Sequence, residues 1–218
     1  MPFIFSLSFI LFTLDFYIEI REDIMKKTDS YRVDYKEKKS GLIHGSDIYN
    51  SRLVQLKENT DDRGSFTEVF QKHWGTVLEP VQWSLVKSES FVFRGMHYHS
   101  RHDEYFCLIQ GSCFLGLKDI RPDSPTFLQH SLYYLTGHDM CSLIFPKGIV
   151  HGWYFPEPSM HLQSVSEAYV DYGKDDNFGC QWNDPDLGIP WPFDFVILSE
   201  RAKKFGKLKD LPPFNEMV

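Results

Sequence analysis

From Leu53 to Val170 the chain is a series of short apolar or alternating segments separated by turn residues. The segments expected to form strands are LVQLK (53–57), SFTEVF (65–70), VQWSLV (81–86), FVFRGMHYH (91–99), YFCLIQ (105–110), CFLGLKDI (113–120), FLQHSLYYL (127–135), MCSLIF (140–145), HGWYF (151–155) and HLQSVSEAYV (161–170). Short strands at this spacing are typical of an all-β sandwich or barrel. Sustained helical periodicity is absent before the tail, where residues 195–208 are expected to hold a short C-terminal helix.

Composition supports this fold class and limits the partners. Phe, Tyr and Trp make up 16% of the 218 residues, which favours β structure and a cavity lined with rings. The formal net charge of −7 argues against a nucleic acid polymer as partner, because such a partner requires a basic surface. A nucleotide ligand needs only a few local cations and stays compatible with this charge. The four cysteines form no CxxC pair, so we expect buried thiols in a reducing compartment.

The N-terminal part differs from the rest. Residues 1–50 are expected to be a leader or arm, poorly ordered or following a misassigned start, and residues 51–218 to form the domain. The apolar run at 2–14 is too short to span a bilayer and is followed by acidic residues. We interpret residues 1–24 as an upstream translation artefact or a disordered leader, since Met25 opens a more ordinary start; a weak membrane-associated segment is the alternative. The protein is expected to be cytoplasmic, without a membrane span.

Two histidine-rich windows carry the chemistry. In the first, His97 and His99 are two residues apart on a predicted strand and therefore point to one face, and Glu104 follows after a polar turn. In the second, His151 begins a strand after a Pro-x-Gly turn. Imidazoles and one carboxylate facing one cavity suit a divalent first-row metal, with Fe, Mn, Ni and Zn as candidates.

This spacing resembles the cupin superfamily. The first cupin motif, H-x-H followed by E and G, is matched by His97, His99, Glu104 and Gly111, and the P-x-G-x-x-H of the second motif is matched by residues 146–151. The resemblance implies an all-β cupin jelly-roll barrel. It also implies metal binding by His97, His99, Glu104 and His151.

A closer resemblance, over residues 61–190, is to the dTDP-4-dehydrorhamnose 3,5-epimerase family, a branch of the cupins. The matching segments are DDRGSFTEVF (61–70), RGMHYH (94–99), GSCFLGLKDIRPDSPTF (111–127), FPKGIVHGWYF (145–155) and WNDPDLGIPWP (182–192). The family implies a jelly-roll homodimer that acts on a nucleotide-linked 4-keto-6-deoxy sugar without a metal. In that mechanism a histidine removes the protons at C3 and C5, and a tyrosine returns one.

The resemblance assigns roles to individual residues. His97 matches the family's basic histidine, and Tyr172 is a nearby candidate for the tyrosine. The remaining substrate contacts that it implies are Arg63, Phe66 and Glu68 at the nucleotide, Arg94 at the diphosphate, Gln82 near the sugar or nucleotide, and Trp182. Planar bidentate donors such as arginine suit phosphate oxygens. For Trp182, core packing is the commoner role of a ring at such a position.

Several residues depart from the family pattern, and these departures affect the expected mechanism. Glu104 falls where the family has a lysine, Ser166 where it has the tyrosine and Ala202 where it has the aspartate that orients the histidine. His99 replaces a usual glutamine. Glu104 and His99 are the residues that complete the metal-type cupin set, so the metal-free mechanism is weakened while a metal mechanism becomes available. His97 cannot both coordinate a metal and accept a proton, and in the first case a tyrosine or His102 would have to move the proton.

Three functions therefore remain open from the sequence. The first is an epimerase-like enzyme for a nucleotide-linked keto-sugar in deoxysugar or surface-polysaccharide biosynthesis. The second is a divalent-metal-dependent cupin isomerase or oxygenase, and the third is a non-catalytic sugar-nucleotide binder. For His102 the alternatives are a group beside the ligands or a solvated residue, of which we favour the solvated one. The nucleotide, the sugar, the metal and the reacting carbon are not specified.

Overall fold

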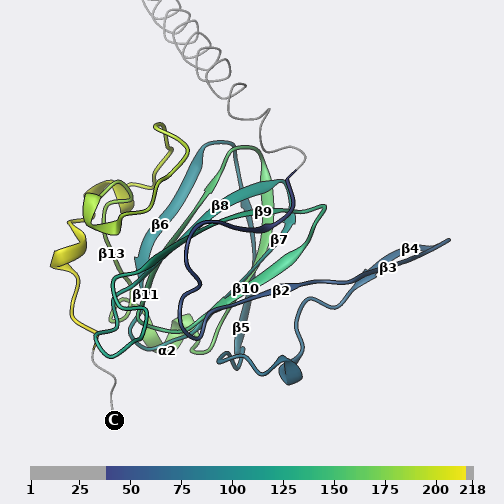
Figure 1. Cartoon of the computed structure of the whole chain (residues 1–218), viewed down its shortest axis with the longest axis horizontal. Coiled ribbons are helices and arrows are strands. Elements are labelled where there is room, and N and C mark those ends of the chain that lie inside the picture. The colour runs from purple at the N-terminus through teal and green to yellow at the C-terminus, as the bar shows by residue number, and fades with distance from the viewer. Residues whose placement is uncertain (1–37, 215–218) are drawn as a thin grey trace, which may run out of the picture. The chain divides into compact units, whose positions relative to one another are not determined.

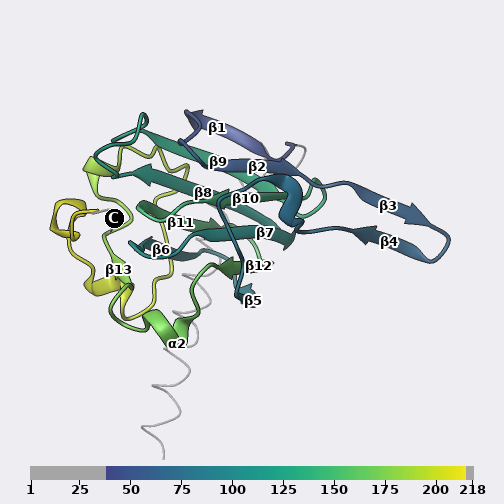
Figure 2. The same cartoon turned by 90° about the horizontal axis from the view of Figure 1, so that it is seen from below.

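Two antiparallel β-sheets face each other in the computed structural model, which describes residues 38–214 (Figures 1 and 2). The six-stranded sheet has the order β1 (Gly41–Gly45), β9 (His130–Thr136), β8 (Ser112–Asp119), β11 (Ile149–Phe155), β6 (Val92–Tyr98) and β13 (Phe178–Gly179). The five-stranded sheet has the order β2 (Arg52–Gln55), β10 (Cys141–Phe145), β7 (Glu104–Gln110), β12 (Ser159–Val165) and β5 (Gln82–Ser88). This is the predicted jelly-roll barrel.

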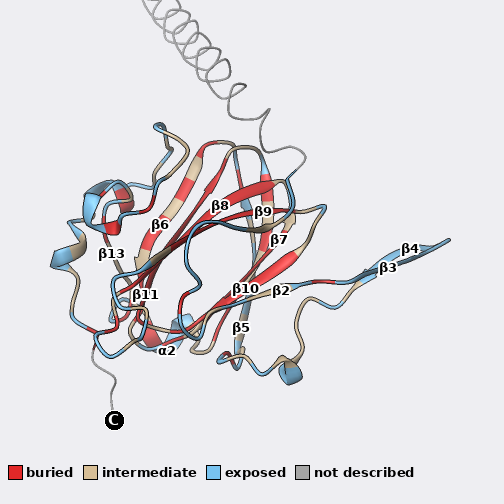
Figure 3. Ribbon diagram, in the orientation of Figure 1, coloured by how far each residue is buried: buried red, intermediate tan, exposed pale blue. Residues whose placement is uncertain are grey.

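The core lies between the two sheets. Buried rings and aliphatic side chains of β8, β9 and β11 meet those of β7 and β10, and Figure 3 shows these strands as the most continuously buried part. Strands β7 to β11 are buried over most of their length, because one face meets this core and the other is covered by loops or by a second apolar cluster. The inward-facing surface of the barrel is therefore the place where a buried site can form.

Every segment predicted as a strand contains one, although the bounds differ by a few residues. The sequence interpretation misses the strand at residues 58–61, the two-residue β13 and one strand in the expected arm. Residues 41–45 form β1, which pairs with β9, and the compact unit begins at Lys39. The segment GLIHG is too short to show an alternating pattern, so its pairing comes from the partner strand and not from its own sequence. The expectations for residues 1–37 fall outside the described residues.

A two-stranded hairpin formed by β3 (Glu58–Asp61) and β4 (Gly64–Thr67) extends away from the barrel in both views (Figures 1 and 2). Almost all of its residues are exposed. The hairpin is followed by a 3-10 turn, η1 (Lys72–Trp74), and by a segment that returns to β5.

Helix is scarce. The single α-helical turn of the described chain is α2 (Tyr169–Tyr172), and η2 (Pro185–Leu187) is a 3-10 turn in the loop that follows β13. The predicted helical tail is limited to two further 3-10 turns, η3 (Ala202–Lys204) and η4 (Leu208–Asp210). Before them the chain is extended, because Ile197 exchanges backbone hydrogen bonds with the start of β6. Within residues 38–214 no helix has the length and apolarity needed to cross a bilayer.

Two glycines shape the strands that carry the histidines. Gly95 has a φ of +132°, and a Cβ there would lie 2.6 Å from Cα of Gly152 on the neighbouring strand. Gly148 has a φ of +82° in the Pro-x-Gly turn, and a Cβ there would lie 2.5 Å from Cγ of Arg121. Only glycine fits such positions without strain. Gly95 thus allows β6 and β11 to approach each other closely beside His97 and His151, and Gly148 allows the turn before β11 to pack against Arg121.

Candidate active site

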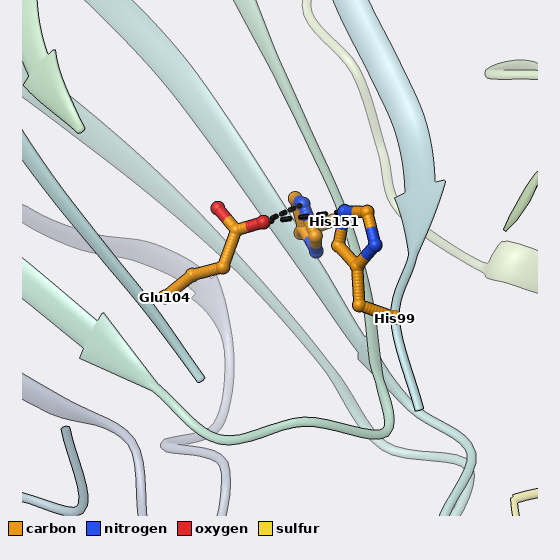
Figure 4. A group of neighbouring side chains, drawn as sticks. All are labelled: His99, Glu104 and His151. Atoms are coloured by element: carbon orange, nitrogen blue, oxygen red, sulfur yellow. Dashed lines mark ion pairs between the residues drawn. The ribbon is translucent and has the colours of Figure 1, made fainter. Parts of the chain in front are cut away.

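One carboxylate oxygen is the centre of a buried cluster of imidazoles. Oε1 of Glu104 lies 3.3 Å from Nε2 of His99 and 3.4 Å from Nε2 of His151 (Figure 4). All three side chains are buried. Ligand atoms that share a tetrahedral metal with bonds of roughly 2.0–2.1 Å lie about 3.3 Å apart. The three residues, called the triad below, therefore have the chemistry and the spacing of a site that could hold a divalent metal.

The triad is assembled from both sheets. Glu104 begins β7 in the five-stranded sheet, and His151 lies on β11 in the six-stranded sheet. His99 directly follows β6 and opens the loop that crosses to β7. Since β6 and β7 belong to different sheets, this loop brings the motif's histidine and its carboxylate together across the barrel.

Backbone carbonyls fix the orientation of both triad imidazoles. Nδ1 of His99 faces the carbonyl of Asp176, and Nδ1 of His151 lies 3.0 Å from the carbonyl of Ile149. A neutral imidazole that donates from Nδ1 carries its lone pair on Nε2. Both Nε2 atoms therefore present a lone pair to a carboxylate oxygen. Two hydrogen-bond acceptors at this distance repel each other unless a cation or a proton lies between the imidazole nitrogen and the carboxylate oxygen.

Protonation states follow from burial. Burial is the main cause that lowers the pKa of His99 to about 4, and it also holds the pKa of His97 well below its ordinary value. Burial acts against ionisation of Glu104, but the neighbouring histidines, His151 first, hold its pKa well below the usual range. Near neutral pH the site therefore combines the neutral imidazoles of His97 and His99 with the ionised carboxylate of Glu104.

His102 is buried, so the favoured expectation of a solvated residue is wrong. Its Nδ1 lies 3.2 Å from Oδ2 of Asp176 and its Nε2 lies 3.6 Å from Oε1 of Glu104. Its ring stacks on Tyr172, with the centroids 4.3 Å apart. Burial disfavours the charged form, but the two carboxylates outweigh it and raise the pKa of His102 to about 9. His102 is therefore a buried cation between two anions.

His97 lies beside the triad but is not part of it. It is directly opposite His151 in the pairing of β6 with β11, and their ring centroids are 6.0 Å apart. His97 and His99 do point into the same region, as the two-residue spacing predicted, with centroids 6.3 Å apart. Unlike the triad members, His97 is only partly buried, so it is more accessible than they are. The predicted four-residue metal set thus contains three residues that converge and one that stands apart.

A cleft of about 220 Å³ adjoins the cluster. Its lining residues come from β5, β12 and α2: Gln82, Ser84, Val86, Gln163, Ser164, Val165, Tyr169 and Tyr172. Tyr172 connects the cleft to His102 through its stacked ring, and Gln163 donates to Oε2 of Glu104 at 3.2 Å. Burial, the largest cause, raises the pKa of Tyr172 to about 12, so its phenol keeps its proton. Amide and hydroxyl groups on the wall suit a ligand rich in oxygen.

Comparison with known proteins identifies the family. The family model of dTDP-4-dehydrorhamnose 3,5-epimerase matches residues 46–210, most of the chain and all of the site. The chain belongs to this family. A dTDP-4-dehydrorhamnose 3,5-epimerase of Shigella flexneri is 31% identical over 178 residues, covering 78% of this chain and 97% of that protein. The spore coat polysaccharide biosynthesis protein SpsL of Bacillus subtilis is 28% identical over 146 residues, covering 66% of this chain and 96% of that one.

Solved structures of family members have the same fold. The dTDP-6-deoxy-D-glucose-3,5-epimerase of Legionella pneumophila, in complex with dTDP-4-keto-L-rhamnose, aligns with a TM-score of 0.70 at 27% identity, covering 81% of this chain and 99% of that chain. The dTDP-4-dehydrorhamnose 3,5-epimerase of Bacillus anthracis, with TDP and PPi bound, aligns with a TM-score of 0.68 at 30% identity, covering 78% and 99%. Members of this family are carbohydrate epimerases with a cupin jelly-roll fold.

The residues expected at the nucleotide lie on the exposed hairpin. Arg63 pairs with Asp61 in the hairpin turn, and Phe66 on β4 is 66% exposed. Glu68, just after β4, accepts a hydrogen bond from Gln71. The hairpin extends away from the strands that carry the cluster (Figure 1), so one chain does not bring these residues to the triad. Their nucleotide contacts stay a prediction.

Other expected substrate contacts are spread over the barrel. Gln82 lines the cleft, and its side-chain oxygen accepts the backbone N–H of Tyr169. Arg94 is half-buried on β6 and donates to Oγ of Ser88 at 2.9 Å. Trp182 packs with Phe93, at 5.9 Å between centroids, which is the packing role considered for it. Of this set, Gln82 is placed at the cleft by the structure.

Asp176, His102 and Gln163 are the site residues that the sequence analysis missed or undervalued. Asp176 lies in a polar run after α2, far along the chain from the loop it contacts, and no spacing motif marks it. For His102, the sequence places three histidines within six residues, and the third falls in a turn. A turn residue is usually exposed, and the packing of Tyr172 and His99 against this one reverses that expectation.

Proposed function

We propose that this chain binds a nucleotide-linked 4-keto-6-deoxy sugar and moves protons at the carbons beside the keto group, in deoxysugar or surface-polysaccharide biosynthesis. Membership of the epimerase family supports the substrate class. The position of His97 is the observation that carries the reaction. It is a neutral, partly accessible imidazole that lies beside His151 but stands outside the triad. Such an imidazole can accept a proton.

The reaction requires a base, a proton donor and stabilisation of negative charge on the sugar oxygen. The 4-keto group makes the protons on C3 and C5 acidic, and His97 accepts one of them. The phenol of Tyr172 is protonated and lines the cleft, so it is the candidate to return a proton. Because the family's tyrosine and aspartate positions hold Ser166 and Ala202, the remaining charge stabilisation has to come from other groups.

The triad is the candidate for that role. We propose that His99, Glu104 and His151 hold a divalent cation, with Fe, Mn, Ni and Zn as candidates. Two imidazole lone pairs and a carboxylate converge on one point, and Nε2 of His151 is buried without a hydrogen-bond partner among the described residues. A bound divalent ion supplies Lewis-acid stabilisation of an enolate oxygen. With His97 outside the triad, cation binding and proton acceptance do not compete for one nitrogen.

A metal-dependent reaction of another class is the second candidate. Two histidines and one carboxylate on one side of an ion are also the ligand set of non-haem iron oxygenases. The triad has this composition. An oxygenase would require Fe(II) and O₂ and would not exchange sugar protons, so the experiment below separates the two functions.

Solvent-deuterium exchange tests the epimerase-like function. The protein is incubated in D₂O with dTDP-4-keto-6-deoxyglucose, and deuterium at C3 and C5 is followed by NMR. We expect incorporation by the unaltered chain and loss of roughly 10²-fold or more in rate with His97→Asn. The exposed His73→Asn is the matched control and should keep the rate. Binding of the sugar nucleotide without any exchange would leave the non-catalytic binder as the function.

Elemental analysis tests the metal centre. Purified protein is compared with a His99→Gln, Glu104→Lys double variant, which restores the residue types that the family usually has at these positions. Near-stoichiometric metal in the unaltered chain and none in the variant supports the site. Equal metal content in both would place any bound metal elsewhere.

We also propose a homodimer, as the family resemblance implied. Trp83 and Leu85 on the edge strand β5, and Val81 just before it, alternate along the chain and are 44%, 60% and 60% exposed. A contiguous exposed apolar row on an edge strand favours a protein partner, and a second copy is the partner that the family suggests. Light scattering after size exclusion should give twice the chain mass, and Leu85→Glu should give monomers. The cytoplasmic location stays a prediction.

A further inference from the structure

Asp176 organises the loop that carries two of the cluster histidines. Its carboxylate is fully buried and its two oxygens have different partners. Oδ1 accepts from the backbone N–H of Ser100 at 2.6 Å and from its hydroxyl at 2.8 Å. Oδ2 accepts from the backbone N–H of Arg101 at 2.9 Å and lies 3.2 Å from Nδ1 of His102. One oxygen thus holds the loop backbone, while the other also reaches an imidazole.

His102 continues this contact toward the triad. Its Nε2 lies 3.6 Å from Oε1 of Glu104, the oxygen that faces the other triad members. The ring cannot turn freely, because it is buried between Tyr172 and His99, with centroid distances of 4.3 and 4.1 Å. Asp176, His102 and Glu104 therefore form a buried line of anion, imidazole and anion.

We propose that Asp176 and His102 are a positioning pair that fixes the Glu104 carboxylate for cation binding, a role that rests on the metal centre proposed above. The imidazole directed at Glu104 orients the ligating carboxylate, and Asp176 holds the imidazole in the matching orientation. Groups that orient metal ligands in this way typically change metal affinity by roughly 10–100-fold when they are removed. Neither residue needs to contact the substrate or the ion.

Titration with Co²⁺ tests the pair, read out by the visible absorption of the bound ion and by the dissociation constant. Asp176→Asn keeps the shape and an acceptor for Ser100 but removes the charge facing His102. His102→Leu removes the imidazole. We expect each variant to weaken Co²⁺ binding by roughly 10–100-fold and to change the absorption spectrum. His102→Gln, which keeps one donor, should bind better than His102→Leu.

A double variant separates positioning from general stability. If the pair acts as a unit, Asp176→Asn combined with His102→Leu should bind Co²⁺ as His102→Leu does, without a further loss. Ser100→Ala is the matched structural control, because it removes a hydrogen bond to Oδ1 and leaves the contact between Asp176 and His102. It should lower the melting temperature while leaving Co²⁺ affinity within about twofold.

The outcomes distinguish the two proposals. Tight Co²⁺ binding by the unaltered chain and by both single variants would overturn the positioning pair and leave the metal centre standing. Equal losses in Ser100→Ala and Asp176→Asn would assign Asp176 a purely structural role and also overturn it. Failure of the unaltered chain to bind Co²⁺ would overturn the metal centre, and the pair's role with it, while deuterium exchange would still test the epimerase-like function.

Discussion

Gln163 donates a hydrogen bond to Oε2 of Glu104 at 3.2 Å, and the other carboxylate oxygen is left to the histidines. Gln163 also lines the cleft. This contact therefore links the surface on which a ligand would lie to the candidate metal site. It also supplies a donor to one of the most deeply buried charges in the described chain.

Removing that donor should destabilise the fold. Gln163→Leu leaves Oε2 of Glu104 without the amide, and we expect the free energy of unfolding to fall by about 1–3 kcal/mol. Urea unfolding followed by tryptophan fluorescence measures it. Gln181→Leu, at an exposed position, is the control and should change the value by less than about 0.5 kcal/mol. An unchanged unfolding curve for Gln163→Leu would mean that water replaces the amide.

Proton transfer and cation binding should be separable by mutation. His97→Asn should reduce deuterium exchange into the keto-sugar by roughly 10²-fold or more while leaving Co²⁺ affinity within about threefold. Glu104→Gln should weaken Co²⁺ binding by more than the roughly 10–100-fold expected for variants of the positioning pair. Isothermal titration and NMR exchange, run on the same preparations, give both quantities. A large loss of Co²⁺ affinity in His97→Asn would show that His97 is a ligand after all.

A buried ion pair outside the site should dominate the stability of the β8–β9 loop. Asp119 is fully buried, and Oδ1 accepts from Nε of Arg121 at 2.9 Å while Oδ2 accepts from the hydroxyls of Ser124 and Thr126. Asp119→Ala leaves the guanidinium without its partner, so we expect a loss of about 3–5 kcal/mol in unfolding free energy. Urea unfolding checks this, with the exposed Asp123→Ala as control. A loss equal to that of the control would contradict the buried pair.

His161 should make stability depend on pH. It is fully buried on β12 against Phe106, and burial, aided by the charge of Arg94, lowers its pKa to about 3. The unfolded chain binds this proton near pH 6.5 and the folded chain does not, so stability rises with pH between these values. As pH falls from 6.5 toward 3, His161 should contribute a loss of about 1.4 kcal/mol per pH unit. The negative charge of Glu104 acts in the opposite direction and raises the pKa of His161, without outweighing burial.

Urea unfolding at pH 7.5, 6 and 5 measures this slope. His161→Phe should reduce the slope of unfolding free energy against pH by an amount that corresponds to at most one proton bound on unfolding. The remaining slope should come from other buried histidines such as His99. His73→Gln, at an exposed position, should leave the slope unchanged. Equal slopes for the unaltered chain and His161→Phe would mean that His161 is solvated or paired in the folded state.

The sequence alone determined the fold class and the family. Apolar runs such as 105–110 and 113–120, bounded by turn residues, indicate buried strands directly, because the signal is local to each segment. The H-x-H, Glu and P-x-G-x-x-H residues are also local signals, since strand periodicity and a glycine turn fix where His99 and His151 point. The strand β1 has no such local signal. Its place in the sheet is set by pairing with β9, some 90 residues away, so the sequence did not predict it.

Only the tertiary structure decided which residues make up the candidate site. The two-residue spacing predicted that His97 and His99 lie on one face. It did not predict that Glu104 contacts His99 and not His97, because that contact depends on how the two sheets pack. Likewise Asp176 and Tyr172 reach His102 from a segment about 70 residues away, and burial there turned an expected surface histidine into a buried cation. Local sequence sets the direction of a side chain along its strand, whereas distances between strands and the loss of solvent arise only when the chain closes on itself.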